Sequence, residues 1–180
     1  MKRTPRPTPS PRRVRYSVAM SLDGCISGPK GENDWIVMDP DIDFRSLFTQ
    51  FDTVLMGRKT YEAARRQGGG AMPGMHAYVF SRTLRQRDCA GVTVSDRLAE
   101  TVAAIKAQPG KDIWLFGGGA LFRSLLDVRL VDAVEVAVIP VLLGGGLPLL
   151  PPPSSLAKLK LTKHTFYEKT GTVSLEYRVE

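Results

Sequence analysis

The stretch DIWLFGGGALFRSLL, Asp112–Leu126, joins a short apolar run to a helix-like segment through three glycines. The pattern predicts a buried strand over Ile113–Phe116 and a helix over Ala120–Leu126. Because glycine has no Cβ, the run Gly117–Gly119 leaves backbone amides open to close approach. The amino end of a helix also favours negative charge, so this turn suits a diphosphate. A tight turn that merely requires positive φ is the alternative that the triplet alone leaves open.

A second strand end with similar properties is MGRKTY, Met56–Tyr61. It places Gly57 at the end of a short apolar strand and Arg58, Lys59 and Thr60 on the first helical turn. Cations at a helix amino terminus oppose the helix dipole. They cost stability there unless an anion lies between them and the amides, so this turn also indicates an anion site.

A third strand end, FSRT at Phe80–Thr83, supplies the hydroxyl of Ser81 and the guanidinium of Arg82. A guanidinium binds phosphate bidentately, as the additional phosphate of NADP requires. Three anion-suited strand ends in one sheet fit a dinucleotide better than a single small anion. The glycine triplet departs from the G-x-G-x-x-G form and lies late in the chain, which argues against an ordinary Rossmann fingerprint.

Strands and helices alternate along the chain, which predicts one α/β domain with a largely parallel sheet. Two final strands, joined by a turn at 169–171, add an antiparallel hairpin at one edge. The expected strands cover residues 13–20, 53–56, 77–80, 92–94, 113–116, 134–139, 159–167 and 172–179. The expected helices cover residues 41–51, 58–66, 96–107 and 120–126.

Two other glycine triplets occur in different contexts. Gly68–Gly70 lies between a helix and a strand and is expected to be a flexible loop. Gly144–Gly146 follows a strand, and the prolines after it prevent a helix from starting. We expect that triplet to form a turn-rich connection that approaches a ligand or a partner chain.

The net charge of +7 raises the question of nucleic-acid binding. Six basic residues lie in the first 15 positions, and the remaining 19 are almost balanced by 18 acidic residues. The excess therefore belongs to a Pro-rich, basic tail, residues 1–12, which we expect to be disordered, with residues 13–180 as the folded domain. Nucleic acid is not an expected partner, and only a weak contact of the tail is left open.

Composition excludes several other classes. No apolar run approaches the roughly 20 residues that span a bilayer, and the amino terminus lacks the apolar segment of a secretory signal. We therefore expect a cytoplasmic protein that needs no membrane partner. The two cysteines and two histidines form no metal-binding pattern, so no metal is expected.

Five motifs, in their order and spacing, resemble the dihydrofolate reductase superfamily: VAMSLDGCISG, MGRKTYE, FSRTL, IWLFGGGALFRSLL and VDAVEVAVIPVLLGGGLPLL. The nearer branch contains the C-terminal reductase domain of the riboflavin-biosynthesis bifunctional deaminase/reductase. The resemblance runs from about Arg13 to the carboxyl terminus. It implies a single-domain dihydrofolate reductase-like fold with a central sheet of about eight strands. It also implies NADPH as hydride donor and, in many members, a homodimer.

The resemblance assigns most of the cofactor site to the three strand ends. Cofactor phosphates would be bound by Gly57, Arg58, Lys59 and Thr60, with Ser81 and Arg82 facing the adenosine 2′-phosphate. The diphosphate and nicotinamide ribose would be lined by Gly117, Gly118, Gly119, Ala120 and Leu121. The backbones of Ala19 and Ile26 would hold the nicotinamide carboxamide.

The substrate side follows the family less closely. Asp41 is the nearest match to the pterin-binding carboxylate of dihydrofolate reductases and Asp43 the second, although both also suit exposed acids at a helix start. Ala137 replaces the threonine that those enzymes carry, which argues against a true dihydrofolate reductase. In the riboflavin branch Asp23, from SLDG, would lie beside the reacting substrate, or it caps its own loop. Trp35 would cover the substrate, or it is a packing residue.

These observations predict an NADPH-dependent reductase that transfers hydride to a C=N or C=O carbon of a small pyrimidine- or pterin-like substrate. The sequence lacks the H-x-E and P-C-x-x-C deaminase signature, so a riboflavin role would be the reductase step alone. Two alternatives stay open. One is a non-catalytic NADP-binding module, and the other is a true dihydrofolate reductase.

Overall fold

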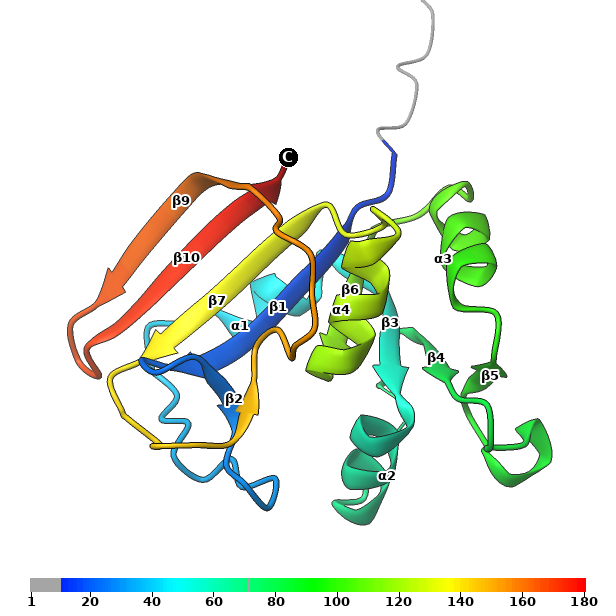
Figure 1. Ribbon diagram of the computed structural model, residues 1–180, viewed down its shortest axis with the longest axis horizontal. Helices are drawn as coiled ribbons and strands as arrows, with labels where there is room; N and C mark the ends of the chain where they lie inside the picture. Colours follow the sequence, from blue (N-terminus) through cyan, green and yellow to red (C-terminus); the bar gives the residue numbers. More distant parts are fainter. Residues whose placement is uncertain (1–10, 71) are drawn as a thin grey trace, which may run out of the picture.

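One eight-stranded sheet organises the computed structural model, which describes residues 11–70 and 72–180 (Figure 1). The strand order is β5-β4-β3-β6-β1-β7-β10-β9. The first six strands are parallel, and β10 is antiparallel to both β7 and β9. The sequence-based prediction of a largely parallel α/β sheet with a carboxyl-terminal hairpin is therefore confirmed.

Most elements lie where the sequence pattern places them. The strands of the sheet are β1 Val14–Ser21, β3 Phe51–Gly57, β4 His76–Phe80, β5 Thr93–Ser95, β6 Asp112–Gly117, β7 Ala133–Ile139, β9 Leu159–Tyr167 and β10 Thr172–Val179. The helices are α1 Phe44–Phe48, α2 Arg58–Arg66, α3 Leu98–Lys106 and α4 Gly119–Asp127, with a short 3-10 turn at Gln86–Asp88. The bounds of α2, β9 and β10 coincide with the predicted ones.

The first helix is shorter than the predicted 41–51. Asp43 caps α1, and Phe51 belongs instead to β3, where it pairs with Asp112 of β6. Phe51 is only 3% exposed. Its position in the apolar repeat therefore reflects burial in the sheet, which helical periodicity cannot distinguish from burial on a helix.

A small second sheet was not predicted. It pairs β2, Cys25–Ser27, with β8, Leu147–Pro148, in antiparallel fashion. The two strands have three and two residues, too few for an alternation pattern. Gly146 precedes β8 at φ 150°, and a Cβ there would collide with the carbonyl oxygen of Ser27. The triplet Gly144–Gly146 therefore lets two backbones approach closely.

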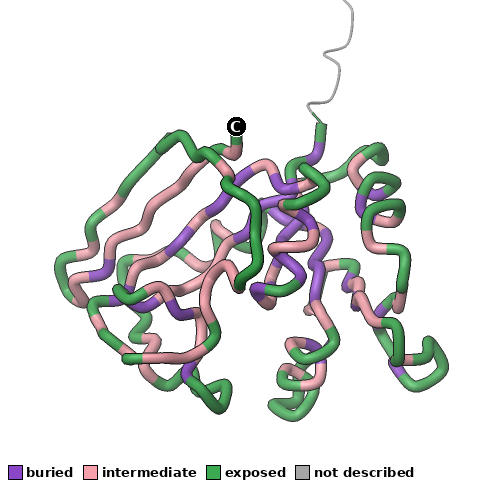
Figure 2. The backbone as a smooth tube through the Cα atoms, viewed as in Figure 1, coloured by how far each residue is buried: buried purple, intermediate pink, exposed green. Residues whose placement is uncertain are grey.

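The helices cover both faces of the sheet. Tyr16 of β1 is buried and stacks on Phe122 of α4, with ring centroids 4.0 Å apart. On the opposite face, Trp114 of β6 contacts Phe48 of α1, with centroids 5.2 Å apart. The buried residues accordingly concentrate in the central strands and in α4 (Figure 2). No helix of the described residues is long and apolar enough to cross a membrane.

The amino-terminal boundary needs one correction, because Arg12 was assigned to the tail but is 6% exposed. Its guanidinium donates to the carbonyls of Lys111 (2.6 Å) and Ile105 (3.3 Å) and to Thr53 Oγ1 (2.7 Å), and it pairs with Asp52. A charged side chain is buried here because each of its donors finds an acceptor. The folded domain therefore includes Arg12. The disorder predicted for the tail concerns residues 1–10, which lie outside the described residues.

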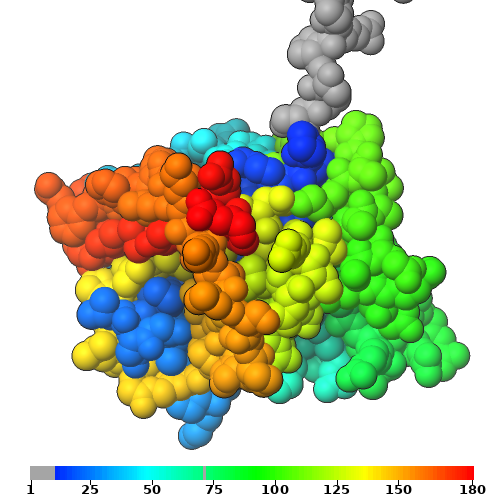
Figure 3. Space-filling view, turned by 45° about the horizontal axis from the view of Figure 1, so that its top comes forward, coloured from blue at the N-terminus to red at the C-terminus, as the bar shows by residue number. Residues whose placement is uncertain are grey.

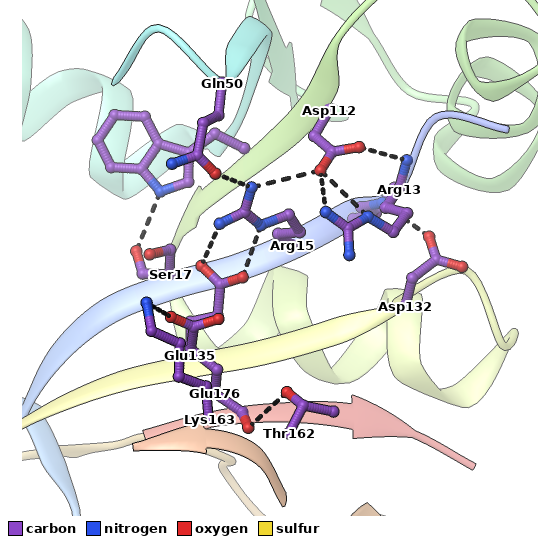
Figure 4. A network of polar contacts seen from close by, with 12 residues as sticks. Arg13, Arg15, Ser17, Gln50, Asp112, Asp132, Glu135, Thr162, Lys163 and Glu176 are labelled. Carbon is purple, nitrogen blue, oxygen red and sulfur yellow. Dashed lines mark hydrogen bonds and ion pairs between the residues drawn. The ribbon is translucent and has the colours of Figure 1, made fainter. Parts of the chain in front are cut away.

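A polar network ties β1 to its neighbours on the α1 face (Figure 4). Arg15 binds both carboxylate oxygens of Glu135 in β7, at 2.6 and 3.0 Å. It also donates to Gln50 at 2.7 Å and lies 3.3 Å from Asp112 of β6. Burial lowers the pKa of Arg15, but the two carboxylates outweigh it and raise that pKa. The network therefore holds β6, β1 and β7 in register near their amino ends.

Candidate active site

Two strand-to-helix turns meet at the carboxyl ends of β3 and β6, which are neighbours in the sheet. If Gly118 carried a Cβ, that atom would lie 3.6 Å from Thr60 Oγ1, on the first turn of α2. A Cβ on Gly117 would lie 4.0 Å from the same oxygen. A Cβ on Gly57 would lie 3.9 Å from both the carbonyl oxygen of Gly117 and the Cβ of Leu121. The structure therefore brings together two of the three turns that the sequence singled out.

Both helices begin at this edge without a side-chain cap. The N-cap residues are Gly57 for α2 and Gly118 for α4, and neither has a side chain that accepts a first-turn amide. Neither first turn contains an acidic residue, whereas that of α2 presents the exposed Arg58 and Lys59. The first-turn amides of a helix need external partners. The arrangement therefore suits an anionic group that approaches both helix ends.

The third turn, after β4, joins through a hydrogen bond. Arg58 Nη1 donates to Thr83 Oγ1 at 2.9 Å. The Nε atom of Arg58 also forms an ion pair with Glu62 Oε1 at 3.6 Å. Ser81 Oγ accepts the amides of Thr83 (3.1 Å) and Leu84 (3.0 Å), so it shapes its own turn. Arg82 is exposed beside them. The turns after β4 and β3 thus bring basic and hydroxyl side chains beside the glycine turn after β6.

The three glycines Gly117–Gly119 differ in why the structure has a glycine at each position. Gly117 has φ 141°, which favours glycine, and its peptide bond to Gly118 is cis. A Cβ on Gly118 would meet only Thr60 Oγ1, at an ordinary contact distance. A Cβ on Gly119 would lie 2.8 Å from the carbonyl oxygen of Pro148 and 2.9 Å from Pro151 Cδ. Gly119 is therefore required by packing against residues 148–151, and Gly118 is the one that borders open space.

Ala19 and Ile26 lie on the other side of the triplet, toward β1. Ala19 is half-buried in β1 and pairs with Ala137 of β7, which in turn pairs with Ser174 of β10. Cross-strand neighbours share a face, so these three small side chains form a row on the α1 face. Ile26 is half-buried in β2.

Asp23 lies in the turn between β1 and β2, where three donors surround its carboxylate. Oδ1 accepts the hydroxyl of Ser21 at 2.6 Å and the amide of Leu143 at 3.2 Å. Oδ2 accepts the amide of Gly144 at 2.8 Å. These hydrogen bonds, that of Ser21 foremost, lower the pKa of Asp23. Asp23 is therefore an ionised residue that joins two loops.

Asp41 and Asp43 are both exposed. Asp41 Oδ1 accepts a hydrogen bond from Lys169 Nζ at 2.6 Å and thereby raises the pKa of Lys169. Asp43 Oδ1 accepts the amide of Ser46 at 2.9 Å and caps α1. The structure thus gives Asp43 the helix-start position that the sequence offered as an alternative, and it places Asp41 against the β9–β10 turn.

Sequence reasoning missed Asp39, which is 1% exposed. Its Oδ2 accepts the amide (3.1 Å) and hydroxyl (2.9 Å) of Thr170, and its Oδ1 accepts the amide of Asp41 (2.9 Å). Burial raises the pKa of Asp39, but these hydrogen bonds outweigh it and lower that pKa. No motif marks this residue, because Thr170, which binds its Oδ2, lies 131 positions away in the sequence.

Trp35 is half-buried, and its indole N–H donates to the carbonyl of Glu32 at 3.1 Å. That bond holds the ring within its own loop. Its assignment as a cover for the substrate stays a prediction.

A family model described as the RibD C-terminal domain matches residues 12–172. The uncharacterized protein YyaP of Bacillus subtilis is 34% identical over 178 residues, which cover 92% of this chain and 94% of that protein.

Two solved structures share the fold. A putative riboflavin biosynthesis protein from Shewanella sp. PV-4 aligns with a TM-score of 0.80 and 24% identity, covering 93% of this chain and 99% of that one. Dihydrofolate reductase from Enterococcus faecalis, complexed with NADP(H) and RAB-propyl, aligns with a TM-score of 0.67 and 18% identity. That alignment covers 93% of this chain and 96% of the other.

Proposed function

The chain belongs to the RibD C-terminal domain family, and from that premise we propose that it is an NADPH-dependent reductase of the riboflavin-pathway type. The observation that carries the proposal is the row of uncapped helix ends and basic side chains at β4, β3 and β6. A row of this kind suits an extended ligand with several negative charges better than a compact anion.

The residues at this edge fit NADPH by their chemistry. The amino ends of α2 and α4 would supply first-turn amides for the diphosphate, those of Gly119 and Ala120 in α4. The turn Gly117–Gly118 and Leu121, whose own amide donates to the carbonyl of Gly118, would line the same position. Gly118 leaves room because a Cβ there would face only Thr60. Lys59 and Arg58 add positive charge, and Ser81 and Arg82 would bind the adenosine 2′-phosphate.

The nicotinamide end would lie toward β1, against Ala19 and Ile26. NADPH, when bound there, supplies a hydride to the substrate carbon. The small side chains of Ala19, Ala137 and Ser174 form the sheet surface beside that position. We propose that the substrate carbon, in a C=N or C=O bond of a small pyrimidine- or pterin-like substrate, faces this row, with Trp35 and Asp41 at its border. Hydride transfer to a C=N or C=O carbon also requires a proton on the nitrogen or oxygen. We propose that solvent water supplies this proton and that the Asp41 carboxylate relays it.

A riboflavin-type substrate, 5-amino-6-(5-phosphoribosylamino)uracil, is favoured over dihydrofolate. Ala137 has no hydroxyl to join a pterin hydrogen-bond network. NADPH absorbance followed with each of these two compounds tests the proposal. Oxidation with the pyrimidine alone supports it, and oxidation with dihydrofolate alone identifies a dihydrofolate reductase instead. Saturable NADPH binding without turnover on either compound favours the non-catalytic module.

We also propose that the protein forms a homodimer through the α4 face of the β9–β10 hairpin. The exposed Leu159, Leu161 and Phe166 share that face, because they pair with Val179, Tyr177 and Val173.

Beside them lies a hollow of about 470 Å³ between α4, β7 and residues 149–159, lined mainly by Phe122, Leu126, Val134 and four leucines. Residues 149–158 run past α4 toward the end of β10 (Figure 3). One of them, Leu156, is 90% exposed. In a two-fold dimer, Leu156 of each chain would contact the apolar hollow of the other chain. The same surface would thus be complementary to itself, as a two-fold interface requires.

A further inference from the structure

The loop after β1 and the loop after β7 are joined at several points. The amide of Leu22 donates to the carbonyl of Val141 at 2.9 Å, and the amide of Leu149 donates to the carbonyl of Gly24 at 2.9 Å. The pairing of β2 with β8 continues from the Gly24–Leu149 bond, on the side away from Leu22. We call residues 21–28 and 141–149 the paired loops.

Asp23 is the side chain that joins the two loops between these main-chain bonds. The amides of Leu143 and Gly144 belong to the part of the second loop that precedes β8, and both donate to the Asp23 carboxylate. Gly144 and Gly145 have φ of 68° and 155°, so this part of the loop has an unusual backbone path that a fixed anion can stabilise. Hydrogen bonds to an ionised acceptor are about twice as strong as neutral ones.

The paired loops contact two parts of the proposed cofactor site, the nicotinamide end and the diphosphate position at the start of α4. Ile26, at the nicotinamide end, lies in β2. Pro148 of the paired loops, together with Pro151 just beyond them, closes over Gly119, the first residue of α4, so tightly that a Cβ would not fit. A displacement of residues 141–149 would therefore move the surface against both the nicotinamide and the start of α4.

We propose that Asp23 is a positioning residue, whose carboxylate clamps Leu143 and Gly144 and so keeps the paired loops in the shape that NADPH needs. This inference rests on the proposed function for its effect on NADPH. A proton donor would need a protonated carboxyl group with a free oxygen facing the substrate. Asp23 instead receives a hydrogen bond from Ser21, Leu143 and Gly144.

The test compares Asp23→Asn with Glu100→Gln, an exposed carboxylate of α3 that takes part in no site contact. Asn keeps the size of the side chain but replaces one acceptor by an NH₂ group, which faces a donor. In the protein without NADPH, amide exchange at 143–146 should rise at least about tenfold in Asp23→Asn and stay unchanged in Glu100→Gln. Unchanged exchange in Asp23→Asn would overturn the clamp, whatever the protein does with NADPH.

Kinetics with 5-amino-6-(5-phosphoribosylamino)uracil separate positioning from proton donation. We expect the KM for NADPH to rise about tenfold in Asp23→Asn, with kcat at saturating NADPH within about threefold and an unchanged pH profile. A loss of more than about a hundredfold in kcat at constant KM, with loss of one limb of the pH profile, would show instead that Asp23 donates the proton. Should Asp23→Asn not fold, Ser21→Ala removes one of the three donors and should raise exchange at 143–146 in the same direction. Failure of the wild type to bind NADPH would count against the proposed function and leave the exchange result to decide the clamp.

Discussion

The hydroxyl of Thr60 lies 3.6 Å from the position that a Cβ on Gly118 would take, so the turn after β6 faces the first turn of α2 across a van der Waals distance. The amino ends of α2 and α4 are thereby brought side by side on adjacent strands. This relationship turns two separate glycine turns into one surface. It also allows the role of that surface to be tested without disturbing the fold.

Gly118→Ala and Gly119→Ala should separate binding from folding. Gly118 has φ −89° and space for a Cβ, so Gly118→Ala should keep the free energy of unfolding within about 0.5 kcal/mol. It should weaken NADPH binding at least about tenfold, because the methyl group occupies the space of the diphosphate. Gly119→Ala should cost about 1–3 kcal/mol, because its Cβ meets the carbonyl of Pro148. Calorimetric titration and urea unfolding measure the two effects, and equal NADPH affinity of Gly118→Ala and the wild type would remove this surface from the cofactor site.

Arg82→Ala should change coenzyme preference. A guanidinium bound to a phosphate contributes about 1.5–3 kcal/mol, so KM for NADPH should rise about 10- to 100-fold while KM for NADH stays constant. Arg87→Ala is the matched control, since Arg87 is exposed and has only a loose pair with Asp88 at 3.9 Å. An equal loss with both coenzymes would place Arg82 away from the 2′-phosphate.

Asp112→Asn should destabilise the protein in a pH-dependent manner. Burial raises the pKa of Asp112, but the hydrogen bond and charge of Arg13, followed by the charge of Arg15, outweigh it and lower that pKa. A carboxylate with a lowered pKa stabilises the fold above its unfolded pKa and loses that effect as pH falls through its folded pKa. We expect a loss of about 2 kcal/mol at pH 7 that shrinks as pH falls below the ordinary range of an aspartate.

Urea unfolding of Asp112→Asn and the wild type at pH 7 and at pH 3 gives the comparison. Asp88→Asn, at an exposed position, should stay within about 0.5 kcal/mol at both pH values. A difference between Asp112→Asn and the wild type that is as large at pH 3 as at pH 7 would contradict an electrostatic role for this carboxylate.

Leu156→Asp should abolish the proposed homodimer. Leu156 is 90% exposed in the single chain, so the substitution removes little packing within it, but a buried aspartate in a two-fold interface lacks a partner. Analytical ultracentrifugation should give a dimer for the wild type and a monomer for Leu156→Asp. Val37→Asp, at another exposed apolar position, should remain dimeric. A dimeric Leu156→Asp, or a monomeric wild type, would rule out this face.

Much of the fold is visible in the sequence because its signals are local. The apolar run before Gly117 and the basic turn after Gly57 each identify a strand end and a helix start. Since the carboxyl ends of parallel strands lie at one edge of a sheet, recognising a parallel α/β fold also places these turns near one another. The cofactor residues could therefore be proposed together before any coordinates.

The features that sequence did not predict depend on distant partners. Arg12 is buried because Asp52, Thr53 and the carbonyls near 105 and 111 surround it. Asp39 is buried by Thr170, more than a hundred positions away. Asp23 was proposed to act on the substrate, and only the coordinates show that Leu143 and Gly144 bind its carboxylate. A polar side chain reveals its type in the sequence but not its partner.

Titration calorimetry of the full chain with NADPH and with NADH tests the central claim most directly. The account predicts one saturable site per chain for NADPH, weaker binding of NADH, and loss of NADPH affinity in Gly118→Ala. Absence of binding heat for both coenzymes at several temperatures, or an NADPH affinity that Gly118→Ala leaves intact, would contradict it.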